Sequence, residues 1–210
     1  STAYNGTALE TSHEDMVHDA QLDYYGKKLA TCSSDRQVKI FEIDGEVRKD
    51  IRTLKGGVNS VSWAPATIPG ALVHITGGAP NVNVSKKFAS GGCDNIIKIW
   101  TYREDSNDWK ECETLEGHTD WVRDIAWAPN VGLQKNYLAS CSQDKTVYIW
   151  TQDALKGWEK KLLRNEKFPD VVWRVSWSLS GNVLAVSCGD NKVTLYKENL
   201  KGEWESLGEL

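Results

Sequence analysis

The sequence predicts an all-β protein with the architecture of a β-propeller, and three observations lead to that prediction. Four segments align with one another, and they begin at Leu29, Phe88, Leu138 and Leu184. In each of the four, an aspartate precedes an aromatic residue by six positions, and successive aspartates are 59, 50 and 46 residues apart. Stretches that alternate with a period of two, as strands do, lie on both sides of these aspartates. A repeat of roughly 40–50 residues made of short strands is typical of propeller blades.

Each repeat is expected to contain four strands joined by turns rich in Gly, Asp and Asn. A polar leader covers residues 1–15, and the repeats span about 16–56, 57–112, 113–165 and 166–210. Residues 66–87 combine Pro, Gly and Asn without alternation, so they are predicted to form a long surface loop inside the second repeat. This loop explains why the first spacing between repeat aspartates is the longest.

The residues that recur from repeat to repeat are predicted to be structural anchors. They are the aspartates Asp35, Asp94, Asp144 and Asp190, the tryptophans Trp100 and Trp150 that follow two of them, and Trp63, Trp127 and Trp177 at one position of the preceding strand. A carboxylate in a tight turn accepts hydrogen bonds from backbone N–H groups. The tryptophans could instead form a ligand-binding aromatic cage, but their repetition favours packing between adjacent sheets.

Plain alternation predicts one apolar face on the strand that precedes each aspartate. Its members are Met16, Ala20 and Leu22 in the first repeat, Val61 and Trp63 in the second, Trp121, Ile125 and Trp127 in the third, and Val171, Trp173, Val175 and Trp177 in the fourth. Because burying a charge on such a face is costly, Leu22→Asp and Trp177→Asp are expected to impair folding.

His118 follows a glycine and is the histidine that we expect to reach a repeat aspartate. With Asp144, a hydroxyl of Ser140 or Ser142, and Trp150, it would form a buried polar chain that fixes the internal register of the blade. A catalytic role for serine, histidine and aspartate is weakly supported. The sequence has no Gly-x-Ser-x-Gly motif, and the aspartate recurs in repeats that lack the histidine.

The composition argues against several other classes of protein. Lys plus Arg number 25 and Asp plus Glu 29, whereas nucleic-acid binders usually carry a basic surface, so no direct nucleic-acid partner is expected. No stretch approaches the roughly 18 apolar residues of a transmembrane helix. Five cysteines at irregular spacing indicate a reduced cytosolic or nuclear compartment, and no C-x-x-C pair points to zinc. We therefore predict no catalytic residue, no metal site and no cofactor, and the protein is expected not to be an enzyme.

The repeats resemble WD repeats, on stretches that include SVSWAPA, GHTDWVRDIAWAP and GDNKVTLYKEN. Within the WD-repeat proteins they are similar to a family of scaffold subunits shared by the COPII outer coat and the outer ring of the nuclear pore. That family has six blades, so the resemblance implies that the second and third blades are absent between Gly56 and Gly57. A short isoform, an engineered deletion and an omitted internal segment are all open. Omission or an atypical isoform is favoured over a free-standing four-bladed propeller.

The ring is expected to stay open, because the first and last repeats each have four strands of their own and no strand remains to close it. Open sheet edges accept strands from another chain. The resemblance implies that a partner donates a whole blade here, and that this partner is the large COPII outer-coat subunit or a scaffold nucleoporin of the nuclear pore. The edge that would meet it is predicted to comprise Met16, His18, Ala20, Leu22, Trp204 and Leu207.

The resemblance therefore implies a non-catalytic scaffold of ER-to-Golgi transport, of the nuclear pore, and of a nutrient-sensing complex upstream of the target-of-rapamycin kinase. It implies a location on the cytoplasmic side of the ER membrane, on COPII vesicles and at the nuclear envelope, with peripheral membrane association through the coat. The alternative is a WD-repeat reader that binds a peptide or modified residue and acts as a substrate adaptor. Arg36, Arg103 and Lys145 are scattered loop candidates for that role.

Overall fold

The structure of the chain is a computed structural model. It describes residues 8–44, 47–55, 58–66, 86–130, 135–153 and 156–209, with the backbone alone for residue 44 and for 47–55. The first residues of the predicted leader, most of the predicted 66–87 loop, and the Gly56–Gly57 junction lie outside the described residues.

The described residues form sixteen strands in four antiparallel sheets, and each sheet contains four strands that are consecutive in the chain. We name these sheets blades 1 to 4. Blade 1 contains β1 (Val17–Leu22), β2 (Lys28–Ser33), β3 (Gln37–Asp44) and β4 (Val47–Lys55), and blade 2 contains β5 (Ser60–Trp63), β6 (Lys87–Gly91), β7 (Ile96–Arg103) and β8 (Asp108–Glu116). Blade 3 contains β9 (Val122–Trp127), β10 (Lys135–Ser142), β11 (Val147–Asp153) and β12 (Trp158–Leu162), and blade 4 contains β13 (Val172–Trp177), β14 (Val183–Cys188), β15 (Val193–Glu198) and β16 (Trp204–Glu209). The all-β prediction with four repeats is confirmed, although β8 places the end of the second repeat at Glu116 instead of 112.

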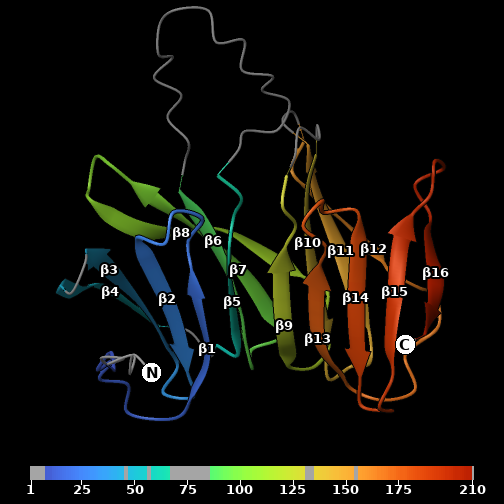
Figure 1. Cartoon of the computed structure of the whole chain (residues 1–210), viewed down its shortest axis with the longest axis horizontal. Helices are drawn as coiled ribbons and strands as arrows, with labels where there is room; N and C mark the ends of the chain where they lie inside the picture. Colours follow the sequence, from blue (N-terminus) through green and yellow to red (C-terminus); the bar gives the residue numbers. More distant parts are fainter. Residues whose placement is uncertain are drawn as a thin grey trace, which may run out of the picture.

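The blades follow one another in chain order, and blades 1 and 4 lie at opposite ends of the row (Figure 1). Within the described part of the chain, one buried apolar cluster joins each consecutive pair of blades. The cluster between blades 1 and 2 includes Ile40 and Phe88, the next includes Ile99 and Leu138, and the last joins residues such as Ile149 and Leu184. None of these clusters joins blade 4 to blade 1, which confirms the predicted open ring.

The four repeat aspartates shape the turn between the second and third strand of every blade. Each one accepts a hydrogen bond from the backbone N–H two residues later, with donor–acceptor distances of 2.9 Å for Asp35, 3.2 Å for Asp94, 2.8 Å for Asp144 and 3.2 Å for Asp190. The residue after the aspartate has a left-handed backbone, with φ between 65° and 68° at Arg36, Asn95, Lys145 and Asn191. A side chain that bonds its own backbone stabilises such a turn.

A β-bulge overturns part of the alternation predicted for the first strands of the blades. In β1, β9 and β13, one extra residue interrupts the pairing with the second strand, at His18, Arg123 and Trp173. A bulge shifts every preceding residue to the opposite face. The buried face of β9 is therefore Val122, Ile125 and Trp127, and Trp121 is 44% exposed.

His118 lies in the buried polar chain expected for blade 3. Its Nδ1 is 3.0 Å from Oδ2 of Asp144, its Nε2 is 2.7 Å from Oγ of Ser140, and Nε1 of Trp150 donates to the same hydroxyl at 2.9 Å. Burial alone would raise the pKa of Asp144, but hydrogen bonds from His118, Thr146 and the backbone outweigh it and hold that pKa well below its usual range. The carboxylate thus stays charged and tied to the loop that enters the blade.

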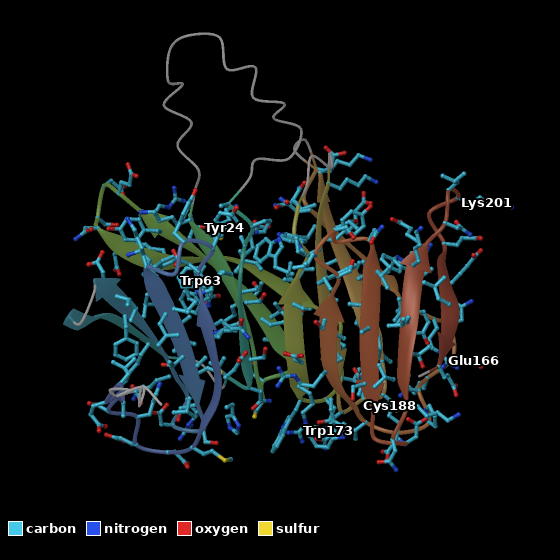
Figure 2. The ribbon with its side chains drawn as sticks, viewed as in Figure 1. Tyr24, Trp63, Glu166, Trp173, Cys188 and Lys201 are labelled. Carbon is cyan, nitrogen blue, oxygen red and sulfur yellow. The ribbon has the colours of Figure 1, made fainter. Side chains whose placement is uncertain are left out.

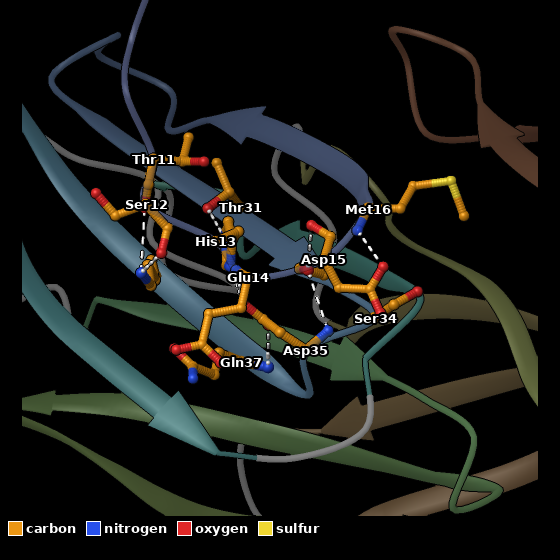
Figure 3. Close-up of polar contacts among 12 residues, drawn as sticks. Thr11, Ser12, His13, Glu14, Asp15, Met16, Thr31, Ser34, Asp35 and Gln37 are labelled. Atoms are coloured by element: carbon orange, nitrogen blue, oxygen red, sulfur yellow. Dashed lines mark hydrogen bonds and ion pairs between the residues drawn. The ribbon is translucent and has the colours of Figure 1, made fainter.

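Blade 1 contains a second histidine of this kind, which contradicts the expectation that His118 alone would reach a repeat aspartate. His13 places Nδ1 2.7 Å from Oδ2 of Asp35 and Nε2 2.8 Å from Oγ1 of Thr31 (Figure 3). Nζ of Lys39 also donates to the carbonyl oxygens of residues 11 and 12, at 3.1 and 2.7 Å. Residues 11–13, which belong to the predicted leader, therefore pack on blade 1. The sequence signal was missed because a serine, not a glycine, precedes this histidine.

Candidate partner-binding interface

Consecutive blades are joined by a hydrogen bond that repeats along their first strands. It involves one repeat-equivalent position, which we call the coupling position, occupied by Asp19, Ser60, Asp124 and Arg174 in blades 1 to 4. In blades 1 to 3, an oxygen of this side chain accepts a backbone N–H from the next blade. These bonds run from Val61 N to Asp19 Oδ2 at 3.2 Å, from Ile125 N to Ser60 Oγ at 3.2 Å, and from Val175 N to Asp124 Oδ2 at 3.0 Å.

Asp124 is the most buried of these carboxylates and links three blades. Its Oδ1 accepts from Oγ of Ser60 at 2.7 Å, and its Oδ2 lies 3.2 Å from Nε of Arg174. Burial raises the pKa of Asp124 above its usual value, against the lowering effect of the hydrogen bonds from Val175 and Ser60 and of the Arg174 charge. The carboxylate is thus a buried acceptor whose charge has one cationic neighbour, Arg174.

In blades 2 and 4, the tryptophan at the end of the first strand hydrogen-bonds to the preceding blade. Nε1 of Trp63 donates to the carbonyl oxygen of Gln21 at 2.8 Å, and Nε1 of Trp177 donates to that of Ala126 at 2.9 Å. Blade 1 has Leu22 at this position, which has no polar atom to offer and is 57% exposed. Trp127, its equivalent in blade 3, is only 7% exposed.

One face of blade 1 therefore has the composition of an inter-blade surface but no blade against it. We call it the blade 1 open face. The repeat equivalents of the blade 3 residues that pack on blade 2 are Val17, Ala20, Leu22, Leu29 and Phe41. Phe41 is only 3% exposed, so the open face consists of the first four. Val17, Ala20 and Leu22 are exposed, whereas the equivalent Val122 and Ile125 are buried.

The outer side of blade 4 has the same property, and we call it the blade 4 open face. Blade 3 buries Ala139, Cys141, Val147 and Ile149 against blade 4. The equivalent residues of blade 4, which form its open face, are Ala185, Ser187, Val193 and Leu195. Antiparallel pairing places Ala185 opposite Leu195 and Ser187 opposite Val193. All four are partly exposed, while their blade 3 equivalents are buried. The end blades of the row thus carry two mainly apolar sheet faces that no blade within the described residues covers.

The residues predicted for the partner edge are only partly brought together. Ala20 and Leu22 lie on the blade 1 open face, but the bulge at His18 places Met16 and His18 out of alternation with them. Trp204 was placed wrongly, because its ring packs against Trp177 with a centroid distance of 5.8 Å and joins the cluster between blades 3 and 4.

The sixth residue of that prediction, Leu207, is exposed on β16, the outermost strand of blade 4. Leu22 is likewise too exposed to support the expectation that Leu22→Asp impairs folding. Comparison of repeat-equivalent positions could have found the open faces, since each blade buries the same positions against its neighbours.

Three side chains form an exposed stack at one end of blades 3 and 4. The guanidinium carbon of Arg123 lies 5.1 Å from the ring centroid of Trp121 and 4.7 Å from that of Trp173. Trp173 lies at one end of its strand in Figure 2 and is 46% exposed. By contrast, Arg36 and Lys145 lie in turns of different blades and Arg103 ends β7, so the structure does not gather these loop candidates.

A cavity of about 260 Å³ lies between blades 1 and 2. Tyr24 and Trp63 contribute to its wall, and the two residues lie close to each other in Figure 2. Its rim also carries amino groups, since Lys28, Lys86 and Lys87 are among the lining residues. The cavity can therefore accept an apolar group attached to an anionic one.

Other kinds of site find little support in the described residues. No group of three His, Cys, Asp or Glu side chains is placed there to hold a metal ion. The five cysteines are free thiols, and burial raises the pKa of Cys32 and Cys141. No helix within the described ranges is long and apolar enough to cross a membrane.

The blades, the repeat aspartates and the histidine-containing polar chains together define a WD-repeat protein. A family model described as "WD domain, G-beta repeat" matches residues 6–42, 109–151 and 161–197. The chain belongs to the Sec13 family of WD-repeat proteins. It is 40% identical to protein transport protein SEC13 of Yarrowia lipolytica, over 95% of the chain and 98% of that relative.

Two further relatives show similar agreement. The chain is 40% identical to protein transport protein SEC13 of Saccharomyces cerevisiae, over 96% of the chain and 98% of the relative, and 39% identical to the SEC13 homolog of Homo sapiens, over 96% and 92%. These alignments extend over 293 and 301 positions, more than the 210 residues of the chain. The relatives therefore contain residues that have no counterpart here, in agreement with the blades expected to be absent.

Proposed function

We propose that the chain is a non-catalytic protein-transport scaffold whose open faces receive a blade donated by a larger partner. The observation that carries this proposal is the pair of open faces on blades 1 and 4. Their positions are buried or partly buried at the three junctions of the described residues, and removing apolar surface from water is the main driving force for such packing. The relatives' names, which refer to protein transport, support the same role.

The finer assignment is that the scaffold acts in the COPII coat, in the outer ring of the nuclear pore, and in a nutrient-sensing complex upstream of the target-of-rapamycin kinase. The partners would be the large COPII outer-coat subunit and a scaffold nucleoporin. The chain would then be found on the cytoplasmic side of the ER membrane, on COPII vesicles and at the nuclear envelope. Its association with membranes would be peripheral, through the coat.

The packing also suggests what the scaffold contributes. A blade seated on an open face would be held by the same apolar packing as an internal junction, and side chains there have little freedom. A partner joined in this way would be stiffened at the point where its blade is inserted. We propose that this rigidity is the physical role of the chain in a curved coat or ring.

The test is co-purification with the blade-donating segment of the large COPII outer-coat subunit of the same organism. Leu22→Asp and Leu195→Asp each place a carboxylate on one open face, and either should weaken binding by roughly tenfold or more, because the charge would have to be desolvated. Leu179→Asp is the matched control, since Leu179 is 94% exposed in the turn after β13 and should bind normally.

The outcomes separate binding from folding. Leu22→Asp and Leu179→Asp should have the melting temperature of the wild type, since both leucines are exposed. Leu195 is only partly exposed, so the melting temperature of Leu195→Asp alone shows how much of its binding loss comes from folding. Full binding by both open-face variants would refute the proposal.

The alternative function, a reader of short peptides, is favoured by the cavity between blades 1 and 2. A reader would lose its peptide on Tyr24→Ala, which removes an exposed ring from the cavity wall without affecting the core. It would keep that peptide in Leu195→Asp, because Leu195 is on the other end blade.

A further inference from the structure

The coupling position changes its chemistry in blade 4. In blades 1 to 3 it holds an oxygen that accepts a backbone N–H of the next blade, as described above. In blade 4 it holds Arg174, and a guanidinium has five N–H donors and no acceptor. A strand that packs beside β13 therefore meets a donor where every internal junction offers an acceptor.

Arg174 is incompletely paired by the chain itself. The structure gives it one ion pair among the described residues, from Nε to Oδ2 of Asp124 at 3.2 Å, and 67% of its side chain is exposed. Asp124 already accepts hydrogen bonds from Ser60 and from the backbone of Val175. The outer edge of the guanidinium, with its two Nη groups, is thus available to a ligand of another chain.

The neighbouring residue, Trp173, shows that the same place is built to be covered. Its equivalent in blade 2, Asn59, donates through Nδ2 to the carbonyl oxygen of Val122 in blade 3 at 2.8 Å. Its equivalent in blade 3, Arg123, stacks on Trp173 itself. Both contact the next blade, whereas Trp173 has no next blade and is 46% exposed.

We infer that the donated blade carries an aspartate or glutamate on its innermost strand, which binds the guanidinium of Arg174. This inference rests on the proposed function and specifies the chemistry of the partner. A carboxylate accepts two parallel bonds from the fork of an arginine, while a carbonyl or hydroxyl oxygen supplies no charge. When the incoming strand covers Trp173, it also removes water from the two Nη groups of Arg174, whose ion pair with Asp124 is made through Nε, and desolvated donors of a cation need acceptors.

Zero-length cross-linking tests the predicted contact directly. The full chain with Arg174→Lys is bound to the blade-donating segment of the large COPII outer-coat subunit and treated with a carbodiimide, which joins an amine to a carboxylate in contact with it. The expected result is a new cross-link from position 174 to an Asp or Glu on the innermost strand of the donated blade, absent from the wild-type complex.

Binding measurements provide the second readout. Arg174→Ala should weaken the complex by roughly tenfold or more, and added salt should weaken the wild-type complex more than the variant. Lys201→Ala is the matched control, because Lys201 is an exposed cation of the same blade that lies at the opposite end of the strands from Trp173 (Figure 2). Its affinity should equal that of the wild type.

Three outcomes would overturn the inference. A complex of unchanged affinity with Arg174→Ala would do so, and so would a complex of Arg174→Lys whose new cross-link maps elsewhere or does not form. The melting temperature of each variant alone shows whether the loss of the Asp124 ion pair has disturbed folding, and the lysine variant keeps a charge there. If the wild-type chain forms no complex at all, the proposed function itself fails.

Discussion

Replacing His118 with alanine tests the polar chain of blade 3, because the imidazole is almost fully buried and both of its ring nitrogens are hydrogen-bonded. The side chain is 1% exposed, with Nδ1 at 3.0 Å from the Asp144 carboxylate and Nε2 at 2.7 Å from the Ser140 hydroxyl. The substitution removes these two bonds, a further contact of Nδ1 with Oγ1 of Thr146 at 3.2 Å, and the edge contact with Tyr148. Asp144 keeps its bonds from Thr119 and Thr146, so the turn itself should survive.

The expected loss follows from these contacts. A hydrogen bond to a charged group contributes about 1.5–3 kcal/mol and a neutral one about 0.5–1.5 kcal/mol. His118→Ala should therefore lower the free energy of unfolding by about 2–4 kcal/mol. His13→Ala, which breaks the corresponding pair with Asp35 and Thr31, should show a loss of similar size, because its bonds are as short.

Urea unfolding of the full chain, followed by tryptophan fluorescence, measures this loss. His18→Ala is the matched control, since His18 is exposed and hydrogen-bonds to the equally exposed Ser34, and it should change stability by less than about 0.5 kcal/mol. Equal free energies of unfolding for His118→Ala and the His18→Ala control would refute the argument that the buried polar chain stabilises the blade.

Two further predictions concern acid stability and packing. The pKa of Asp144 is lowered in the folded state, so the stability that its carboxylate contributes is fully present above the unfolded pKa of about 3.9 and is lost as the pH falls toward the folded pKa. Asp144→Asn should therefore reduce the fall in melting temperature between about pH 6 and about pH 3. An unchanged fall would contradict the lowered pKa. A Cβ at Gly91 would lie 2.7 Å from Cγ1 of Val122, so Gly91→Ala should cost about 1–3 kcal/mol in thermal unfolding. Gly157→Ala, with open space around the new Cβ, should be neutral, and equal effects of the two would disprove the close packing of blades 2 and 3.

The sequence predicted the repeats and their turns because these depend on local chemistry. Asp35, Asp94, Asp144 and Asp190 each bond the backbone two residues later, an interaction contained within a few consecutive residues. The same local character made the period-two strands recognisable. His13 escaped prediction because a serine precedes it, so nothing next to it in the chain resembled the Gly-His pair that pointed to His118.

The faces of the first strands could not be predicted by alternation, because a bulge depends on pairing with another strand. Nothing in the sequence marks the extra residues His18, Arg123 and Trp173 as bulges. Only the register of pairing with the second strand reveals them. Trp204 was misplaced for a related reason, since its packing against Trp177 joins β16 to β13, with two strands of the sheet between them. Such contacts depend on three-dimensional neighbours.

The sequence by itself determined that this protein is an all-β row of four WD-type blades. Recurring aspartates and period-two alternation suffice for that, because both are interactions of near neighbours in the chain. Only the tertiary structure decided which faces of blades 1 and 4 lack a neighbour. It also decided that Arg174 of blade 4 stands at the coupling position, where blades 1 to 3 have a hydrogen-bond acceptor. Those features depend on which blade packs on which, and packing joins residues such as Asp124 and Val175 that are 51 positions apart.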